Sequence, residues 1–394
     1  MKKTLLQFFL FLLSLITGFK TKAQTGKYDL EHIQFSVESA ADWTALFNRK
    51  SGWFGGDGIY TIPLNGNEQK TAGKNSTTLF IFSDSMIGQT TDSTMLPGYK
   101  MIHNAVAYLI GNQPDKENMK FLWNQQAGAA ESVFSPHTPK TNPADYFWLG
   151  DGFVNQALKN TTYIFGYRVR NFSSDAFGFK EVGNVLIKIP AGKSFPFAGQ
   201  KQLETPFYAD TAGTITSFGA GIYVNTVAAG AKNPDGYIYI YGVRGLAKEL
   251  LVARVKPKDF EDFEKWRFKA GNVWSAKMSR SEAITNSVSN ELSLTRLLDG
   301  RYALIFQVGG MTTSVGMRLG ASPAGPFGPI IKLWNCSADL KRPTYVVYNA
   351  KAHPTLSKPG ELLISYNINS TEFIKDLSTD PHLYRPRFIR VKFK

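Results

Sequence analysis

The stretch Gly236-Tyr237-Ile238-Tyr239-Ile240-Tyr241-Gly242 decides the fold class, because it is short, aromatic and β-branched and has glycine at both ends. Such a segment is typical of a β-strand between two turns. Four further segments of this kind are Thr77 to Asp84, Thr161 to Gly166, Gly300 to Phe306 and Glu361 to Tyr366. We therefore expect an all-β protein, with helices only at Ala40 to Asn48 and Pro257 to Lys265.

Each aromatic strand follows, by roughly 10 to 20 residues, a segment of small residues that in most cases carries one polar or charged group. These segments are Gly55 to Gly58, Leu149 to Gly152, Gly219 to Gly221, Ser289 to Glu291 and Asn349 to His353. A repeat of about 60 to 85 residues suits four-stranded blades around an axis, with the small residues innermost, where large side chains do not fit. The sequence predicts a single domain, a five-bladed β-propeller over residues 24–394.

The last repeat is incomplete and ends at Phe388 to Phe393. We expect an N-terminal strand at His32 to Val37 to complete this blade, which closes the ring and protects both termini. A β-sandwich or two smaller β domains is the alternative, although no linker or change in composition divides the chain after Gln24.

Residues 1–23 have the pattern of a secretory signal peptide. Lys2 and Lys3 precede an apolar run from Leu5 to Ile16, and Ala23 stands before the expected cleavage site. The run is shorter than the about 20 residues that a spanning helix needs, and no later segment replaces it. We expect an exported protein, periplasmic or secreted, without a transmembrane segment; an uncleaved N-terminal anchor is the alternative.

The charge and the cysteine content exclude other classes. The formal net charge is +14, but the basic residues are scattered, whereas a nucleic-acid binder concentrates them on one face or helix. We expect no nucleic-acid partner, and some attraction to acidic glycans or an anionic cell envelope. Cys336 is the only cysteine, so an intramolecular disulfide is excluded. We expect a monomer.

Four acids are the candidates for chemistry, because the inner strands of a propeller direct polar groups into a shared axial pocket. Asp57, Asp151 and Glu291 belong to the inner segments, and Asp84 ends the second strand of the first repeat. Glycoside hydrolysis uses two carboxyl groups, one protonated and one ionised, and crowding separates their pKa values. The plainer interpretation is that Asp57 and Asp151 cap turns beside glycine and that Glu291 is an exposed acid at the start of a strand.

Four short stretches carry a resemblance to a known family: Trp53 to Gly58, Leu79 to Ser85, Asn290 to Ser293 and Asp299 to Tyr302. They resemble an uncharacterised secreted family of bacteroidete-type proteins, which is similar to the endo-D-arabinanases and more distantly to the five-bladed arabinanases and fructosidases. The resemblance implies an acidic pair on the first blade, here Asp57 and Asp84, and an acid on a later inner strand, a role for Asp151 or Glu291.

The identity of the proton donor stays open at this point. The stereochemical outcome also stays open, because it depends on whether the carboxyl groups lie about 5 Å or about 6.5 to 9.5 Å apart.

Seven residues are candidates for substrate binding: Trp53, His103, Asn104, Trp148, Arg168, Arg244 and His353. His353, on the fifth inner segment, could contact a sugar hydroxyl, tune an acid or ligate a metal, or it could be structural. Arg168 and Arg244 follow the aromatic strands of two repeats, where they could bind an acidic substrate or lock blades together; we favour locking. Trp53 and Trp148 could stack on a sugar ring or pack in the core.

No motif predicts a cofactor. The histidines lack a tight ligand spacing, so no catalytic metal is expected, although oxygen ligands are plentiful enough for a structural calcium or sodium ion on the axis. There is no G-x-S-x-G elbow, phosphate-binding glycine loop or dinucleotide fingerprint. The leading hypothesis is a glycoside hydrolase acting on a furanose-containing or similar glycan. The alternatives are a glycan-binding propeller without catalysis and a protein-interaction scaffold.

Overall fold

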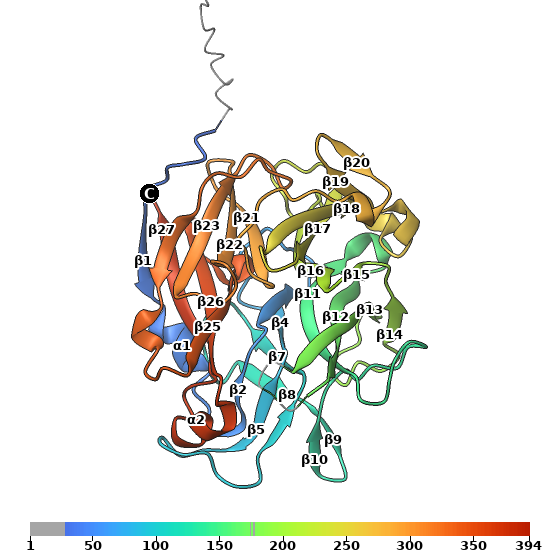
Figure 1. Cartoon of the computed structure of the whole chain (residues 1–394). Coiled ribbons are helices and arrows are strands. Elements are labelled where there is room, and N and C mark those ends of the chain that lie inside the picture. Colours follow the sequence, from blue (N-terminus) through green and yellow to red (C-terminus); the bar gives the residue numbers. More distant parts are fainter. Residues whose placement is uncertain (1–27, 174, 176–177) are drawn as a thin grey trace, which may run out of the picture.

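The computed structural model describes residues 28–394 except 174, 176 and 177, and this part of the chain is almost entirely β-structure (Figure 1). The expected signal peptide lies outside the described residues. Helix α1 (Ala41–Leu46) lies inside the predicted first helix, and α2 (Phe373–Thr379) was not predicted. The predicted helix at Pro257 to Lys265 is wrong: two 3-10 turns form instead, because Asp262 accepts a hydrogen bond from the amide of Glu264 and starts a new turn. None of the described helices is long and apolar enough to cross a membrane.

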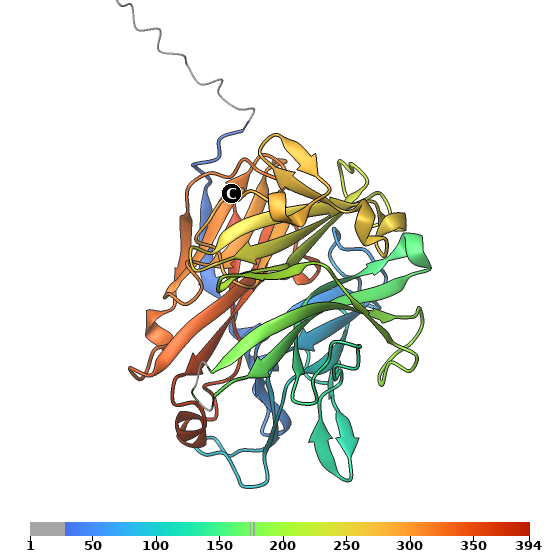
Figure 2. The same cartoon turned by 45° about the vertical axis from the view of Figure 1, so that its right-hand side comes forward.

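The described strands form five antiparallel sheets of four or more strands (Figures 1 and 2). The first contains β3 (Tyr60–Pro63), β4 (Thr77–Phe82), β7 (Ala105–Ile110) and β8 (Met119–Leu122). The same chain segments continue into a three-stranded sheet of β2 (Ser51–Gly56), β5 (Ser85–Gln89) and β6 (Lys100–Ile102). The second contains β11 (Tyr146–Asn155), β12 (Thr161–Asn171), β13 (Phe179–Ile189) and β14 (Lys201–Glu204).

The other three sheets follow in chain order. The third contains β15 (Tyr208–Thr211), β16 (Thr214–Asn225), β17 (Tyr237–Arg244), β18 (Glu249–Val255), β19 (Arg267–Ala270) and β20 (Val273–Ser275). The fourth contains β21 (Leu292–Arg296), β22 (Tyr302–Gln307), β23 (Ser314–Gly320) and β24 (Ile331–Asn335). The fifth contains β1 (Phe35–Ser39), β25 (Tyr345–Ala352), β26 (Glu361–Ser370) and β27 (Arg387–Phe393). A separate hairpin is formed by β9 (Asn124–Gln126) and β10 (Ala129–Glu131).

One strand of each sheet lies at a common axis. The inner strands β3, β11, β16, β21 and β25 contact one another in sequence, and a hydrogen bond between Thr61 Oγ1 and His353 Nδ1 of 3.1 Å joins the last to the first. Figure 2 shows the sheets spreading outward from the middle of the molecule. This radial arrangement is that of a β-propeller. Each predicted aromatic strand is the neighbour of an inner strand, as the repeat indicated.

Glycines allow the inner strands to approach one another. A Cβ atom on Gly150 of β11 would lie 2.7 Å from the carbonyl oxygen of Gly219 in β16, and one on Gly221 would lie 2.8 Å from that of Leu292. A Cβ on Gly152 would lie 2.6 Å from both Ile62 Cδ1 and the carbonyl oxygen of Tyr163. The small residues of the inner segments are therefore required by strand-to-strand distance.

We expect Gly152→Ala to lower the free energy of unfolding by about 1 to 3 kcal/mol, because a backbone oxygen cannot move aside as a side chain can. Denaturant unfolding measures this change. Gly73→Ala is the control, since its added Cβ meets nothing closer than Ser76 Oγ at 3.4 Å. Equal stability of the two variants would show that the inner strands are less closely packed than described.

The two ends of the described chain meet in the fifth sheet. Strand β1 pairs antiparallel with β27, from Phe35 opposite Phe393 to Ser39 opposite Ile389. The prediction that an N-terminal strand completes the last sheet is confirmed, with the strand three residues later at its start than the predicted His32.

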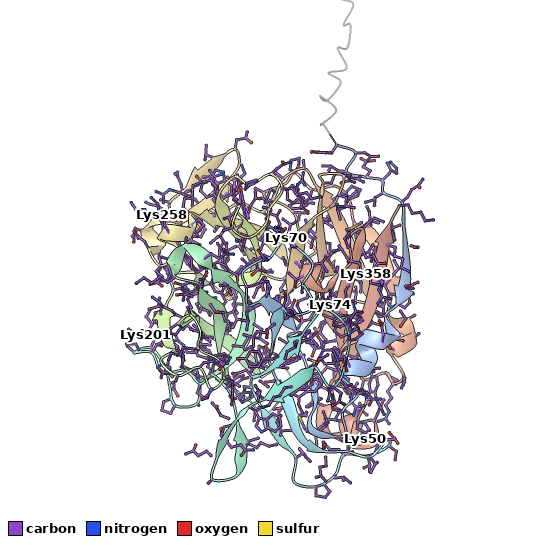
Figure 3. The ribbon with its side chains drawn as sticks, turned by 180° about the vertical axis from the view of Figure 1, so that it is seen from behind. Lys50, Lys70, Lys74, Lys201, Lys258 and Lys358 are labelled. Atoms are coloured by element: carbon purple, nitrogen blue, oxygen red, sulfur yellow. The ribbon has the colours of Figure 1, made fainter. Side chains whose placement is uncertain are left out.

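Residues 64–76, which connect β3 to β4, cross one end of the axis. The amide of Gln69 donates to the carbonyl of Ala229 after β16 at 3.0 Å, and the amide of Ala72 donates to that of Thr355 after β25 at 2.7 Å. Gln156, after β11, donates to the carbonyl of Gly66 at 3.0 Å. In Figure 3, which shows the molecule from behind, Lys70 and Lys74 of this segment lie near the middle of the view. The segment therefore closes this end of the axis; we call it the axial cap.

Candidate functional site

Breaks in the sheet ladders place polar side chains at the axis. The pairing of an inner strand with its neighbour shifts register between Leu149 and Gly152, between Phe218 and Gly221, and between Tyr348 and Lys351. A β-bulge of this kind re-aims the bulged side chain. Asp151 occupies the first of these bulges, and Asp57 lies in the corresponding break between β2 and β3.

Asp57 and Asp84 lie side by side in two breaks between strands: Asp57 between β2 and β3, and Asp84 between β4 and β5. The amide of Asp57 donates to the carbonyl of Asp84 at 3.1 Å, and the amide of Ser83 donates to the carbonyl of Asp57 at 2.8 Å. Burial, and then the negative charge of Asp84, raise the pKa of Asp57 to about 8, although the hydroxyl of Tyr348 donates to Asp57 Oδ2 at 2.5 Å and opposes this shift. Asp57 is therefore protonated at neutral pH.

The carboxyl group of Asp84 has hydrogen-bond partners different from those of Asp57. Its Oδ1 lies 2.9 Å from His103 Nδ1 and accepts a hydrogen bond from Trp148 Nε1 at 3.0 Å. The His103 ring stacks on Tyr146 with a centroid distance of 3.7 Å. Asp84, His103 and Trp148 are all partly exposed, so a ligand can reach this group. The structure thus brings four sequence candidates together: Asp57, Asp84, His103 and Trp148.

Asp151 joins two inner strands. Its Oδ1 accepts from the amide of Gly152 at 2.8 Å, and its Oδ2 accepts from the amide of Ile222 in β16 at 2.7 Å. Burial raises its pKa to about 7, while these two hydrogen bonds and the charge of Lys351 act in the opposite direction. Both carboxyl oxygens of Asp151 are used to hold the backbone.

Glu291 forms an ion pair with Lys351, whose side chain is 1% exposed. Glu291 Oε1 also accepts from Asn349 Nδ2 at 2.7 Å. Burial raises the pKa of Glu291, and Lys351 opposes that shift. The Lys351 ammonium further lies over the ring of Tyr60, 4.6 Å from its centroid. Lys351 is thus the cation at the centre of the buried carboxyl groups.

His353 is structural. Its two ring nitrogens lie 3.1 Å from Thr61 Oγ1 and 2.8 Å from Ser365 Oγ, and the residue is 1% exposed. Burial, and then the charge of Lys351, lower its pKa to about 3, so the ring is neutral at physiological pH. Of the interpretations left open for His353, the structural one agrees with these contacts, which tie β25 to the first sheet.

The side chains of four other binding candidates contact the protein itself, and two of them are buried in the core or against backbone. Trp53 is 1% exposed and stacks on Phe121, so it packs in the core. Asn104 is fully buried and donates to the carbonyls of Phe134 and Phe147, so it fixes backbone.

The two arginines pair with glutamates. Arg168 is buried and forms an ion pair with Glu204, and Arg244 pairs with Glu249 and donates to the carbonyl of Ser281. The favoured expectation was that both arginines lock blades together; each instead forms its ion pair within its own sheet, Arg168 with β14 and Arg244 with β18.

Sequence reasoning missed Tyr348, Tyr384 and Lys351 as neighbours of the acids. Tyr348 and Lys351 flank the bulge of β25, and Tyr384 also forms a hydrogen bond with Asp57. Lys351 lies inside the predicted inner segment Asn349 to His353 and Tyr348 directly precedes it, so that segment was the signal for both. Tyr384 follows α2, and no pattern in the sequence connects it with the axis.

A small cavity of about 40 Å³ lies on the axis beneath the axial cap. It is lined by Tyr60, Thr61, Glu68, Asp151, Gly152, Phe153, Ile222, Val224, Ser293, Leu294, Lys351, Ala352, His353 and Pro354. Burial raises the pKa of Glu68, which the cap carries, well above its usual range. The cavity has room for a few water molecules and not for a sugar ring. Neither Asp57 nor Asp84 lines this cavity.

Within residues 28–173, 175 and 178–394, no group of three or more His, Cys, Asp or Glu side chains is placed to hold a metal ion. A wider surface groove of about 510 Å³ lies between Tyr28 to Gln34 and Asp299, Arg301 and Lys394. It contains none of the inner strands.

The fold and the axial carboxyl groups define a β-propeller with a candidate active site at its centre. The chain belongs to the family described as a domain of unknown function (DUF5005), whose model matches residues 40–393. The resemblance to an uncharacterised family is thereby confirmed. No curated protein matches the sequence.

The chain is also similar to solved structures, of which one has the same fold. A crystal structure of a candidate hydrolase from Bacteroides ovatus aligns with a TM-score of 0.70 and 20% identity, over 93% of this chain and 92% of that chain. An α-L-arabinofuranosidase from Clostridium thermocellum aligns with a TM-score of 0.43 and 12% identity, over 89% and 92% of the two chains. An exo-β-1,3-galactanase from Phanerochaete chrysosporium aligns with a TM-score of 0.43 and 10% identity, over 86% and 64%.

Proposed function

We propose that this protein is an exported glycoside hydrolase whose residues 24–394 form one five-bladed β-propeller, with each of the five sheets as a blade. It cleaves a polysaccharide or oligosaccharide, furanose-containing in our preferred version. The observation that supports the proposal is the pair Asp57 and Asp84: two carboxyl groups in adjacent breaks between strands, the charge of one raising the pKa of the other, with different hydrogen-bond partners.

The two environments favour different roles. Asp57, with a pKa of about 8, retains its proton at neutral pH and is our choice for the general acid that protonates the leaving oxygen. Asp84 is oriented by His103 and Trp148 and is our choice for the second carboxyl group, which acts on the opposite side of the bond as base or nucleophile. Glu291 supports this pair because its charge raises the pKa of Asp57, and Asp151 lies on β11, the inner strand next to β3.

The pH dependence follows from the pKa of Asp57. Because the acid works only while protonated, turnover should fall as pH rises through about 8. Tyr348→Phe removes a hydrogen bond that favours the ionised form, so it should move this limb of the profile to higher pH. Initial rates from pH 5 to 10 measure the shift. Tyr99→Phe, at an exposed tyrosine, is the control; the same profile in all three proteins would remove Asp57 as the acid.

The proposal is tested by reducing-sugar release from arabinans, galactans, fructans and host-type glycans. Release from one class by the protein, and not by a heat-inactivated sample, is the expected result. Binding to a glycan without release would contradict the hydrolase and favour a binding propeller, whose acids hydrogen-bond hydroxyl groups.

A further inference from the structure

Glu181, on β13, carries a carboxyl group that has no role in the proposed catalytic pair Asp57 and Asp84. It is partly exposed, and its Oε1 accepts a hydrogen bond from Ser217 Oγ at 2.6 Å, across the boundary to the third sheet. No Lys, Arg or His among the described residues forms an ion pair with it, whereas Glu204, in the next strand of the sheet, pairs with Arg168. A partly exposed carboxyl group without a cation near an active site is a candidate for ligand binding.

Phe179 and Trp148 link the strand that carries Glu181 with Asp84. Phe179, two residues before Glu181 on β13, packs against Trp148 with a centroid distance of 4.6 Å, and Trp148 donates to Asp84. Tyr167 of β12 lies opposite Trp148 in the β11–β12 ladder. Glu181, Glu291 and Asp151 all act electrostatically on the Tyr167 hydroxyl. Glu181 therefore borders the same axial region as the proposed active site, from the side of the second and third sheets.

We propose that Glu181 is a further substrate-binding residue, whose carboxyl group hydrogen-bonds a hydroxyl of an uncharged sugar unit lying along Trp148 and Phe179. Aromatic rings present apolar faces to sugar rings, and a carboxyl group beside them can bind the hydroxyl at the ring edge. The inference rests on the proposed function for the identity of the ligand.

Burial raises the pKa of Glu181 to about 8, with Ser217 opposing the shift. The titratable groups that interact with it are Tyr167 of β12 and Tyr208 of β15, both tyrosines. Glu181 thus both donates and accepts hydrogen bonds below pH 8 and only accepts above it.

The test compares Glu181→Ala with Ser217→Ala in hydrolysis of the best neutral polysaccharide from the panel of arabinan, galactan and fructan. We expect Glu181→Ala to raise KM about tenfold and to change kcat less, the signature of lost substrate binding. Ser217→Ala removes the same hydrogen bond and should raise KM far less. Equal KM changes in the two variants would show that Glu181 only braces the boundary between the sheets and would overturn the inference.

A second readout uses Glu181→Gln, which cannot ionise. The increase in KM between pH 6.5 and pH 9 should be smaller for this variant than for the unaltered protein; an equal increase would contradict the inference. Failure of the proposed function gives a different result. If no glycan is hydrolysed but one binds, and Glu181→Ala weakens its affinity about tenfold in titration calorimetry, the hydrolase is excluded and the binding role of Glu181 stands.

Discussion

Asp57→Asn and Asp84→Asn should each lower turnover by about 100-fold or more while the protein remains folded. Asparagine preserves the size of either side chain but can neither donate a proton as an acid nor act as a base, and loss of such a group typically costs a factor of about 10² to 10⁴. The hydrogen bonds that orient the two groups come from Tyr348, His103 and Trp148, and these side chains remain in both variants. The measurement is initial rate on the released-sugar assay at pH 6.5, with thermal unfolding of each variant alongside.

The matched control is Glu117→Gln, which neutralises an exposed carboxyl group far from the inner strands. Its rate should equal that of the unaltered protein. If either aspartate variant keeps more than a tenth of the activity, that aspartate is not the catalytic acid or base, and Asp151 or Glu291 becomes the next candidate.

Lys351→Met should destabilise the protein by about 3 to 5 kcal/mol, which is the usual effect of removing one partner of a buried ion pair. Lys351 is 1% and Glu291 11% exposed in their side chains, so the carboxylate of Glu291 would lose its cation without gaining access to water. Loss of the ammonium would also raise the pKa values of both Glu291 and Asp151, because Lys351 lowers each of them.

Denaturant unfolding of three variants measures how much the Lys351–Glu291 ion pair contributes to the free energy of unfolding. Lys351→Met combined with Glu291→Gln should recover a large part of the lost stability, since Asn349 can still donate to the amide oxygen. Lys375→Met breaks an exposed pair with Glu372, 77% and 46% exposed, and should change stability by no more than about 1 kcal/mol. A Lys351→Met effect as small as that of Lys375→Met would show that water reaches Glu291 in solution.

The sequence was sufficient to predict the strands that carry the fold, because their signal is local. Aromatic residues identified the strand next to the inner strand in every sheet, and small residues marked positions on or just before the inner strands, since both are properties of a few consecutive positions. The same reasoning failed at Pro257 to Lys265, where an aspartate restarts the turn and prevents a continuous helix.

The surroundings of the acids could not be predicted in this way. Tyr348 lies 291 positions from Asp57, and their contact exists only because the fifth sheet returns to the first. Lys351 and Glu181 likewise have their partners, Glu291 and Ser217, in the neighbouring sheet. For His353 the local pattern was misleading, because a histidine between small residues on an inner strand is as suitable for bracing two sheets as for meeting a ligand.

The axial cap leaves only one end of the axis through which a ligand could enter or leave. Its hydrogen bonds to residues that follow several inner strands close one end of the axis, so the axis is not an open channel. Under the proposed function, a polymer could not pass through the closed end, so a glycan would bind from the opposite end, and both halves of a cleaved chain would leave by the route on which the intact chain arrived. The proposed function then predicts that chain ends and bends within a chain, which can approach Asp57 and Asp84 from one side, are cleaved in preference to straight segments.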